Sequence, residues 1–457
     1  MGTPVMYRHL IRTLVAITAS LAFAGSAFAQ GLIRDAEIES IIRDFTNPIL
    51  EVAGLVPEDV DLFIVNDPSL NAFVAGGQNI FLHTGLIIEA DTPGQLKGVI
   101  AHETGHIAGA HGARRAQDFA KAARPGYISI GLGIIAIAAG APEAGAALIA
   151  NAQQLTALQF FTFTRAQESS ADQAALTYLE RLGESPAGLV EFFEEFRYQE
   201  VLSQARRFEY FRTHPLASDR ILALRQRAEE TGLLEVPATE DDLRKMEILH
   251  AKLIGFLEPP VKVYQRYPRS DTSMPARYAR AHSAIKTLDF GYALEETQLL
   301  LQEDPANAYF HELQGFILFE QGDIEGSIEP YARAVELSGG HPLILVSHAR
   351  SLITRGDPGD VEAGETALRQ ALLLEPNNVF AWSNLAVALE KQGRRAEAEL
   401  ATAERAFHVG DYIGAQTFGR RAIEGLPRGT PLHRRASDIV AVTDPRLEEN
   451  RRYYRNR

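Results

Sequence analysis

Two histidines four residues apart, with a glutamate directly after the first, constrain this chain more than any other feature. His102, Glu103 and His106 form an H-E-x-x-H motif within a run whose apolar residues recur every three or four positions. On a helix of about 3.6 residues per turn, the two imidazoles lie one turn apart on one face and can reach a single ion. A third ligand must then come from a later part of the chain.

The helix that carries the motif has a clear predicted start. Asp91-Thr92-Pro93 supplies a capping residue followed by proline at the first helical position. From Leu96 to Ile107 the polar motif shares the apolar stripe that faces a core. Unpaired polar groups there would each cost roughly a few kcal/mol, whereas a metal ion satisfies both His102 and His106. We therefore predict one zinc ion per chain.

Glu103 gives the predicted metal site a chemical role. A zinc ion with three protein ligands leaves a fourth position for water and lowers the pKa of that water to about 7. Glu103 follows the first ligand directly and can accept the proton of this water as a general base. The alternative is a chance match on an ordinary helix, which the capped, core-facing context disfavours.

Two acidic residues in a later helical pattern are candidates for the remaining contacts. Glu168 and Asp172 are four residues apart, so they share one helical face. One of them could bind the metal while the other contacts a ligand. The alternative is a solvated acidic face paired with Arg165.

The order of these motifs, H-E-x-x-H followed by E-x-x-x-D, resembles the M48 family of zinc endopeptidases. The resemblance implies that His102, His106 and Glu168 bind zinc and that Glu103 is the general base. It also implies that Asp172 contacts a ligand histidine.

Thr213-His214-Pro215, followed by Arg220, extends the resemblance, because the family has an H-P-x-x-x-x-R segment after its zinc helices. His214 would then be catalytic, either stabilising the oxyanion or filling the fourth zinc position in a resting state; a plain loop histidine is the alternative. Arg220 could pair with Asp172, bind substrate carbonyls or lie on a helix surface.

His111 is not expected to be the third ligand. Some zinc endopeptidases use H-E-x-x-H-x-x-G-x-x-H, and Gly109 fits that pattern, but the final position is Gly112. On a continuing helix His111 would point about 180° away from His102.

Short β-rich runs precede the motif, at residues 62–65, 72–75 and 79–82, and turn signals separate them. They predict a small antiparallel sheet in an α+β domain that is mostly helical. Asn71, Ala72, Phe73 and Val74 are candidates for an edge strand that holds an extended peptide substrate by main-chain bonds. Plain scaffolding is an equal alternative.

The first 29 residues resemble a secretory signal, with Arg8 and Arg12, an apolar run and an Ala27-Phe28-Ala29 cleavage pattern. A membrane anchor is the alternative, but the apolar run is short. With no cysteine, folding needs no disulfide. We expect the protein to be exported to the periplasm, where it could contact the outer membrane. Because the net charge is −14, we expect no nucleic-acid partner.

Residues 127–155 are rich in alanine, glycine and isoleucine. They read either as a buried helical pair or as a flap that contacts a membrane surface, since neither half reaches the roughly 18 residues of a spanning helix.

A helical repeat fills the C-terminal half. Pro305, Pro342 and Pro376 end successive helical pairs and are 37 and 34 residues apart, a pattern that resembles tetratricopeptide repeats. The expected domains are a signal peptide at 1–29, a metallopeptidase domain at 30–257, a linker at 258–275, a tetratricopeptide-repeat solenoid at 276–440 and a basic tail at 441–457. Stacked helical pairs offer a concave surface for a peptide or a partner.

Together these features imply an exported zinc endopeptidase. The resemblance to M48 peptidases that carry tetratricopeptide repeats implies substrates that are misassembled or stalled outer-membrane proteins, recruited through the repeats. It also implies chaperone-like activity and the barrel-assembly machinery as a partner. The alternative is a repeat-based assembly factor whose metal site is latent or structural. Glu103 favours the enzyme, because a structural zinc site closes its fourth position with another ligand.

Overall fold

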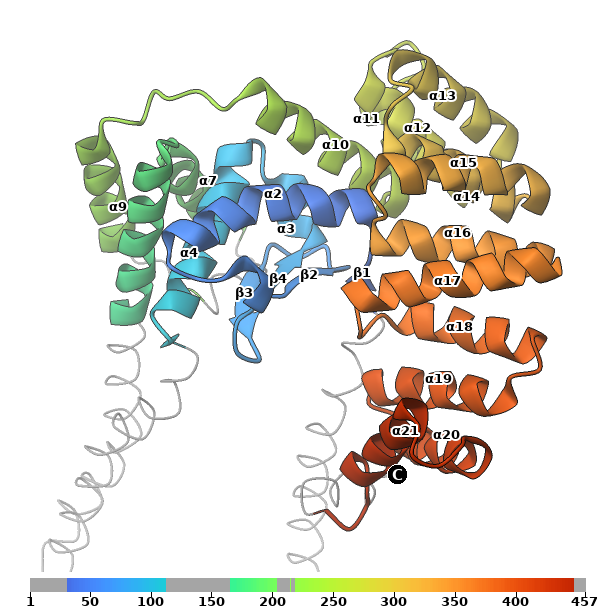
Figure 1. The fold of residues 1–457 in the computed structure, drawn as a ribbon. Helices are drawn as coiled ribbons and strands as arrows, with labels where there is room; N and C mark the ends of the chain where they lie inside the picture. Colours follow the sequence, from blue (N-terminus) through green and yellow to red (C-terminus); the bar gives the residue numbers. More distant parts are fainter. Residues whose placement is uncertain (1–30, 112–164, 204–213, 215–217, 448–457) are drawn as a thin grey trace, which may run out of the picture. The chain divides into compact units, whose positions relative to one another are not determined.

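The structure is a computed structural model of the 457-residue chain, and it describes residues 31–111, 165–203, 214 and 218–447 (Figure 1). The chain divides into two compact units. The first runs to His250 without Asp35–Glu37, and the second comprises Asp35–Glu37 and the chain from Ala251 onward. A helical unit with one small sheet and an all-helical repeat unit confirm the predicted fold class.

The sheet of the first unit has four strands among the described residues, in the order β1-β2-β4-β3. The strands are β1 (Leu32–Ile33), β2 (Leu62–Val65), β3 (Ala72–Ala75) and β4 (Asn79–His83). β3 and β4 form an antiparallel hairpin, but β2 and β4 run parallel. The sheet is therefore mixed, and the prediction of a purely antiparallel sheet was wrong.

The connection between β2 and β3 explains the parallel pairing. It does not turn back beside β2, because the Asp67 carbonyl accepts hydrogen bonds from Thr84 Oγ1 and the Gly85 amide at the start of α3 (Thr84–Glu89). The chain thus reaches the far edge before the hairpin returns as β4. Alternation along a strand decides which face is buried, but it does not decide which strand is the neighbour.

The motif helix α4 (Pro93–Ala108) begins where its sequence predicts. Thr92 is the N-cap, and its hydroxyl accepts a hydrogen bond of 3.2 Å from the Gln95 amide. Pro93 occupies the first turn, where its missing N–H leaves no hydrogen bond unmade. The middle of α4 is buried, including His102 and Glu103.

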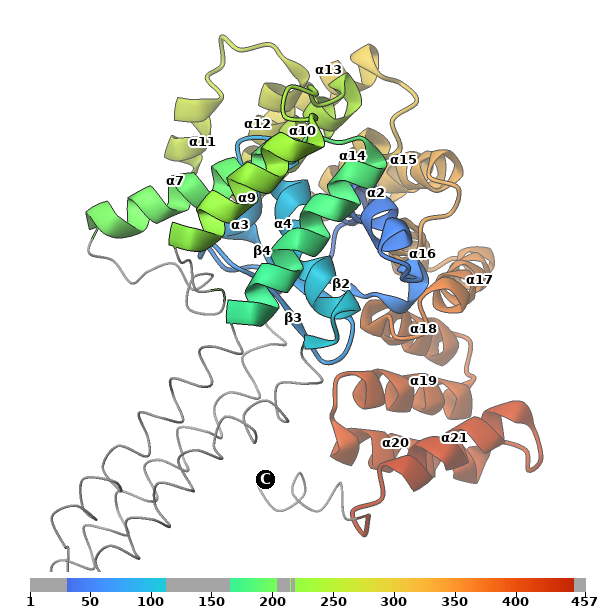
Figure 2. The same cartoon turned by 90° about the vertical axis from the view of Figure 1, so that its left-hand side faces the viewer.

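Close packing against α4 positions the acidic helix. Figure 2 shows the helix of residues 165–182 running beside α4. A Cβ added at Gly105 would lie 2.9 Å from the Ala171 carbonyl oxygen, so glycine is needed for this approach. The other helices of this unit are α2 (Ala36–Val52), the 3₁₀ turn η3 (Pro57–Asp59), α7 (Ala187–Ser203), α9 (Ser218–Thr231) and α10 (Glu240–Leu257), of which α2 and α10 also contribute residues to the second unit.

The second unit is a stack of helical pairs (Figure 1). Asparagine caps begin two of the pairs, and Asn378 Oδ1 accepts a 2.9 Å hydrogen bond from the Ala381 amide. Small and branched apolar residues such as Leu368 and Leu385 fill the space between the pairs. The helices are α11 (Pro260–Arg266), α12 (Met274–Lys286), α13 (Phe290–Glu303), α14 (Ala308–Glu320), α15 (Ile324–Leu337), α16 (Pro342–Arg355), α17 (Pro358–Leu374), α18 (Val379–Lys391), α19 (Arg395–His408), α20 (Tyr412–Gly425) and α21 (Pro431–Val442).

A buried polar cluster attaches Asp35–Glu37 to the second unit. The Lys252 ammonium lies 2.7 Å from Asp35 Oδ1 and 3.1 Å from Glu37 Oε2. The Tyr278 hydroxyl donates a 2.6 Å hydrogen bond to the same Glu37 oxygen. Three residues from near the start of the described chain therefore belong to the repeat unit. Within the range 258–275, where a linker was expected, the structure has α11 and the first residues of α12.

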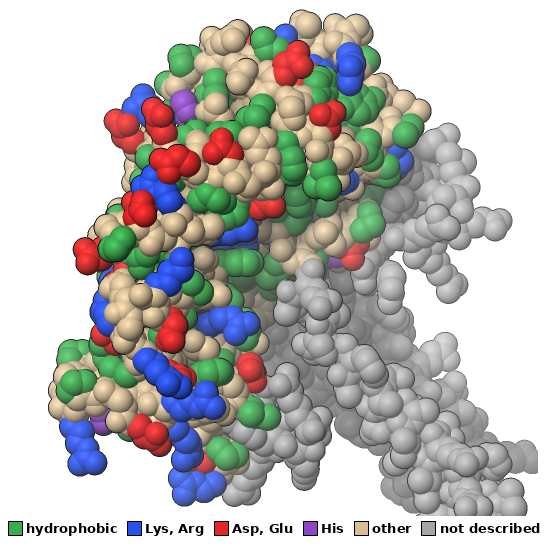
Figure 3. Space-filling view, turned by 90° about the vertical axis from the view of Figure 1, so that its right-hand side faces the viewer, with side chains coloured by type: hydrophobic (Ala, Val, Ile, Leu, Met, Phe, Trp, Pro, Cys, Tyr) green, Lys and Arg blue, Asp and Glu red, His purple; other side chains and the backbone are tan. Residues whose placement is uncertain are grey.

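The surface of the second unit mixes residue types. Figure 3 shows hydrophobic, acidic and basic side chains interspersed on one face, with lysine and arginine more frequent toward the bottom of the view. None of the helices in the described ranges is long and apolar enough to cross a membrane. The predicted signal peptide, the segment 127–155 and residues 448–457 of the tail lie outside the described residues.

Candidate metal centre

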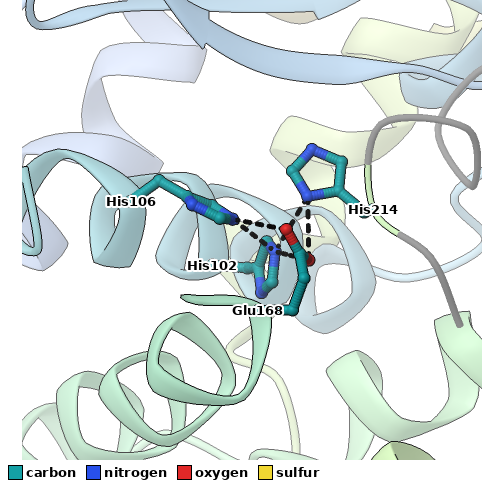
Figure 4. Close-up of side chains that lie close together, drawn as sticks. All are labelled: His102, His106, Glu168 and His214. Carbon is teal, nitrogen blue, oxygen red and sulfur yellow. Dashed lines mark hydrogen bonds and ion pairs between the residues drawn. The ribbon is translucent and has the colours of Figure 1, made fainter. Parts of the chain in front are cut away.

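Four side chains from three parts of the first unit converge on one point (Figure 4). α4 supplies His102 and His106, the helix of 165–182 supplies Glu168, and the short segment before α9 supplies His214. One potential ligand atom from each lies within 4.8 Å of all the others. The structure therefore brings together the three residues expected to bind zinc and adds His214.

The spacing of these atoms fits a tetrahedral ion. His102 Nε2 and His106 Nε2 are 3.1 Å apart. Glu168 Oε2 lies 3.4 Å from His102 Nε2, and Glu168 Oε1 lies 3.5 Å from His106 Nε2. Ligands bonded to zinc at about 2.0–2.1 Å are separated by about 3.3 Å at the corners of a tetrahedron. Two imidazole lone pairs that face each other at this distance repel unless a proton or a cation lies between them. The residues thus fit a zinc ion.

His214 lies at the distance expected of a fourth corner. Its Nδ1 is 3.3 Å from His102 Nε2 and 3.1 Å from Glu168 Oε2. Its Nε2 lies 3.4 Å from Glu103 Oε1. The distances from His214 Nδ1 to His102 and Glu168 are those of a further zinc ligand, and all four ligand atoms lie within 4.8 Å of one another.

Glu103 is fully buried beside the four side chains. Apart from the ion-pair contact of 3.4 Å between Oε1 and His214 Nε2, neither of its oxygens has a hydrogen-bond partner within the described part of the chain. Burial raises the pKa of this carboxyl group above its usual range. A buried carboxylate needs polar partners, and water or a substrate amide in the site would supply them, as a general base requires.

Asp172 and Arg220 hold the first histidine from behind. Asp172 Oδ1 lies 3.0 Å from His102 Nδ1, so the opposite nitrogen of the ring faces the other ligands. Arg220 donates two hydrogen bonds of 2.8 and 2.9 Å to Asp172. Its Nη1 also lies 3.2 Å from Glu168 Oε2. Of the three roles considered for Arg220, its position shows the pairing with Asp172.

The electrostatics of the site favour a positive charge beside His102. Burial opposes that charge, but the Asp172 and Glu168 carboxylates outweigh it and raise the pKa of His102 to about 10. Burial and then the charge on His102 lower the pKa of His106 to about 2, so this ring stays neutral and keeps a lone pair. Burial opposes ionisation of Glu168, yet hydrogen bonds with His102 and His214 hold its pKa far below the usual range. A bound cation would take the place of the proton that His102 otherwise carries between these carboxylates.

Two neighbours of the site were not predicted as functional residues. Phe193 of α7 stands edge-on to the His102 ring, with centroids 5.9 Å apart, and the Arg220 guanidinium lies 5.5 Å from its centre. Only the apolar pattern of α7 marks Phe193, and it does not point to the metal site.

His111 is outside the ligand group of the described residues, as expected, but it contacts His106. The reason given for excluding it was wrong, because α4 ends at Ala108 and does not continue.

The candidate substrate strand contributes no side chain to the ligand group of the described residues. Ala72, Phe73 and Val74 belong to β3, the last strand in the sheet order, and β3 contacts α4. Asn71 precedes it and is buried, and its carbonyl accepts a hydrogen bond from the His83 amide. One side of β3 is paired with β4.

Residues 32–228 match the model of peptidase family M48. The matched range includes the sheet and all four candidate ligands. The chain is thus a peptidase whose residues 32–228 are similar to family M48. Over 330 residues the chain is 27% identical to the beta-barrel assembly-enhancing protease of Escherichia coli (strain K12). These residues cover 72% of this chain and 67% of that protein. It is 24% identical over 432 residues to a putative beta-barrel assembly-enhancing protease of Vibrio cholerae, covering 92% and 85%.

A further relative matches a shorter part of the chain. Metalloprotease LoiP of Escherichia coli (strain K12) is 27% identical over 182 residues, which cover 39% of this chain and 65% of LoiP. Among solved structures, the crystal structure of MamA aligns with a TM-score of 0.29 and 18% identity, covering 39% of this chain and 97% of MamA.

Proposed function

We propose that this chain is a zinc-dependent endopeptidase of the cell envelope that cleaves misassembled or stalled outer-membrane proteins. The observation that carries the proposal is the tetrahedral spacing of His102, His106 and Glu168 beside the buried carboxylate of Glu103. The histidine and carboxylate ligand set is typical of hydrolytic zinc sites, which keep a position for water or substrate.

In this proposal Glu103 moves the protons. Zinc, when bound, supplies an acidic water and polarises the substrate carbonyl. Glu103 takes a proton from the attacking water and returns it to the leaving amine nitrogen, as its position next to a ligand allows. Asp172 and Arg220 fix His102 so that Nε2 stays directed at the ion.

β3 is the proposed binding edge for the substrate. It is the last strand in the order of the described sheet, and β4 pairs with one side of it. An extended peptide could add as a further strand along Asn71 to Val74 by main-chain hydrogen bonds. Such binding depends little on side chains, which suits an enzyme that acts on varied unfolded segments.

His214 is proposed to hold the enzyme in a resting state. With Nδ1 at the spacing of a fourth ligand, it would occupy the position that water or a substrate carbonyl needs. Activity would then require the segment that carries His214 to move. Substrate docking elsewhere could favour that open form only by binding it better than the closed form.

The substrate is inferred from relatives, and the location in the periplasm is inferred from the predicted export signal. Proteins named beta-barrel assembly-enhancing proteases align with 72% to 92% of this chain, which supports proteins of β-barrel assembly as substrates. The stacked helical pairs would recruit these substrates or the barrel-assembly machinery. The predicted signal peptide at 1–29 would direct export. In the alternative, the repeat unit acts as an assembly factor and the metal site is latent.

Metal analysis of two variants tests the centre. The wild type should carry one zinc per chain, and Glu168→Ala should lose it, because one of three protein ligands is removed. Glu180→Ala is the matched control, since Glu180 lies on the same helix and pairs with Arg227 away from the site. Full zinc retention in Glu168→Ala would place the third ligand elsewhere.

A further inference from the structure

We propose that His111 positions the metal ligand His106 by accepting a hydrogen bond from its Nδ1. The inference rests on the proposed zinc centre and adds a residue that the H-E-x-x-H and E-x-x-x-D motifs do not contain.

The two rings meet through defined atoms. His111 Nδ1 lies 2.9 Å from His106 Nδ1, and the rings stand at 79° with centroids 5.0 Å apart. The other nitrogen of His106 faces His102 Nε2 and Glu168 Oε1. A ring nitrogen that binds a metal carries no proton, so the proton of His106 must be on Nδ1. It can then be donated to His111, whose own proton lies on Nε2.

His106 needs such a partner more than His102 does. The side chain of His102 is fully buried and has the Asp172 carboxylate at its Nδ1, whereas 12% of the His106 side chain is exposed. Ligand histidines usually donate their second N–H to a fixed acceptor, which sets the tautomer and the direction of the ring. With His111 in this role, both histidines of the motif have an acceptor behind them.

The backbone is shaped to bring His111 back to the end of α4. The helix stops at Ala108, and Ala110 has a φ of 51°, in the left-handed region that residues other than glycine rarely adopt. A Cβ at Gly109 would lie 2.4 Å from His111 Nε2, so only glycine allows the ring to fold over this position. The ring that results is buried. A strained turn next to a site persists only where the surrounding structure enforces it, and here it delivers an acceptor to a ligand.

Two substitutions separate positioning from packing. His111→Asn keeps a side-chain oxygen that can accept the hydrogen bond, whereas His111→Phe keeps a ring and removes the acceptor. We expect zinc affinity, measured by competition with a chelator, to fall by about 10- to 100-fold in His111→Phe and by only a few-fold in His111→Asn. The visible spectrum of the cobalt-substituted protein should change in His111→Phe and stay close to wild type in His111→Asn.

His250→Phe is the control, because His250 is a buried histidine of the same unit whose Nε2 contacts the Ile87 carbonyl oxygen. It should leave zinc affinity unchanged. Wild-type affinity in His111→Phe would overturn the inference while leaving the zinc centre intact. Equal losses in both His111 variants would also overturn it, since packing alone would then matter. If His111→Phe does not fold, a folded His111→Asn that loses zinc like Glu168→Ala overturns it, and one that keeps zinc supports it. A wild type that binds no zinc would overturn the centre itself.

Discussion

His102 and Asp172 are joined across the back of the metal centre, with Nδ1 and Oδ1 3.0 Å apart. Arg220 binds both carboxylate oxygens of Asp172 from the other side. The carboxylate therefore sets the direction of the first ligand, and the arginine sets the direction of the carboxylate.

Asp172→Asn should weaken zinc binding without removing a ligand. The amide matches the shape of the carboxylate but is uncharged, and it removes one of the two carboxylates that pair with Arg220, so we expect affinity to fall by about 10- to 100-fold. Competition with a chelator measures this. Asp242→Asn is the control, because Asp242 pairs with Lys97 in the same unit. Equal affinity in wild type and Asp172→Asn would show that Asp172 does not position His102.

His214→Ala distinguishes two roles by the sign of its effect. If His214 fills the fourth position at rest, the variant should cleave casein faster and less selectively than wild type, and the observed spacing of Nδ1 leads us to predict this result. If His214 instead stabilises the oxyanion, kcat should fall by about 10² to 10³. Zinc content is measured alongside, to show that the site is still loaded. An unchanged rate would remove His214 from both roles.

The second unit contains a buried ion pair whose effect on stability should depend on pH. Arg280 is 1% exposed and donates a 2.7 Å hydrogen bond from Nε to Glu296 Oε1. Its Nη1 bonds the carbonyls of Pro268 and Asp271. Burial opposes ionisation of Glu296, but hydrogen bonds from Arg280, Tyr292 and Arg277, together with the charge of Arg280, outweigh it and lower the pKa of the carboxyl group.

Glu296→Gln should therefore destabilise the repeat unit by about 3 kcal/mol at pH 7, because it leaves the buried Arg280 without a counter-charge. A lowered folded pKa means that the stabilisation is present above the ordinary carboxyl pKa and is lost as pH falls through the folded value. The gap between variant and wild type should thus close under acid conditions. Urea titrations followed by the fluorescence of Trp382, the one tryptophan of the chain, measure this unit selectively.

Glu295→Gln is the matched control, since Glu295 is next to Glu296 in the sequence and its side chain is exposed. It should leave the urea midpoint near that of wild type at every pH. A Glu296→Gln variant whose deficit stays constant from neutral to acid pH would mean that the charge on Glu296 is not what stabilises Arg280.

The parts of the site that could be predicted are those set by short-range geometry. The spacing of His102 and His106 and the cap at Thr92 depend on a single helix, and the structure has both. The prediction that Glu168 is a ligand rested on the order of the two motifs along the chain. Its approach to α4 depends on Gly105 meeting Ala171, a contact that no periodicity reveals.

The features that were missed depend on the chain leaving its local pattern. The parallel pairing of β2 with β4 follows from how residues 66–71 bond to α3, which alternation along a strand cannot show. Glu37 and Lys252 are 215 residues apart, so nothing near either residue marks their contact. His111 was placed by assuming that α4 continues, and only Gly109 hinted at the turn that brings it back.

Cleavage of casein or of an unfolded barrel protein by Glu103→Gln decides whether Glu103 is the general base of a zinc peptidase centre. Glutamine keeps the shape of the side chain but cannot accept a proton from water, so we expect retained fold, retained zinc and a rate reduced by about 10² to 10⁴. Cleavage near the wild-type rate by a zinc-loaded Glu103→Gln protein would contradict the assignment of this site as a peptidase centre.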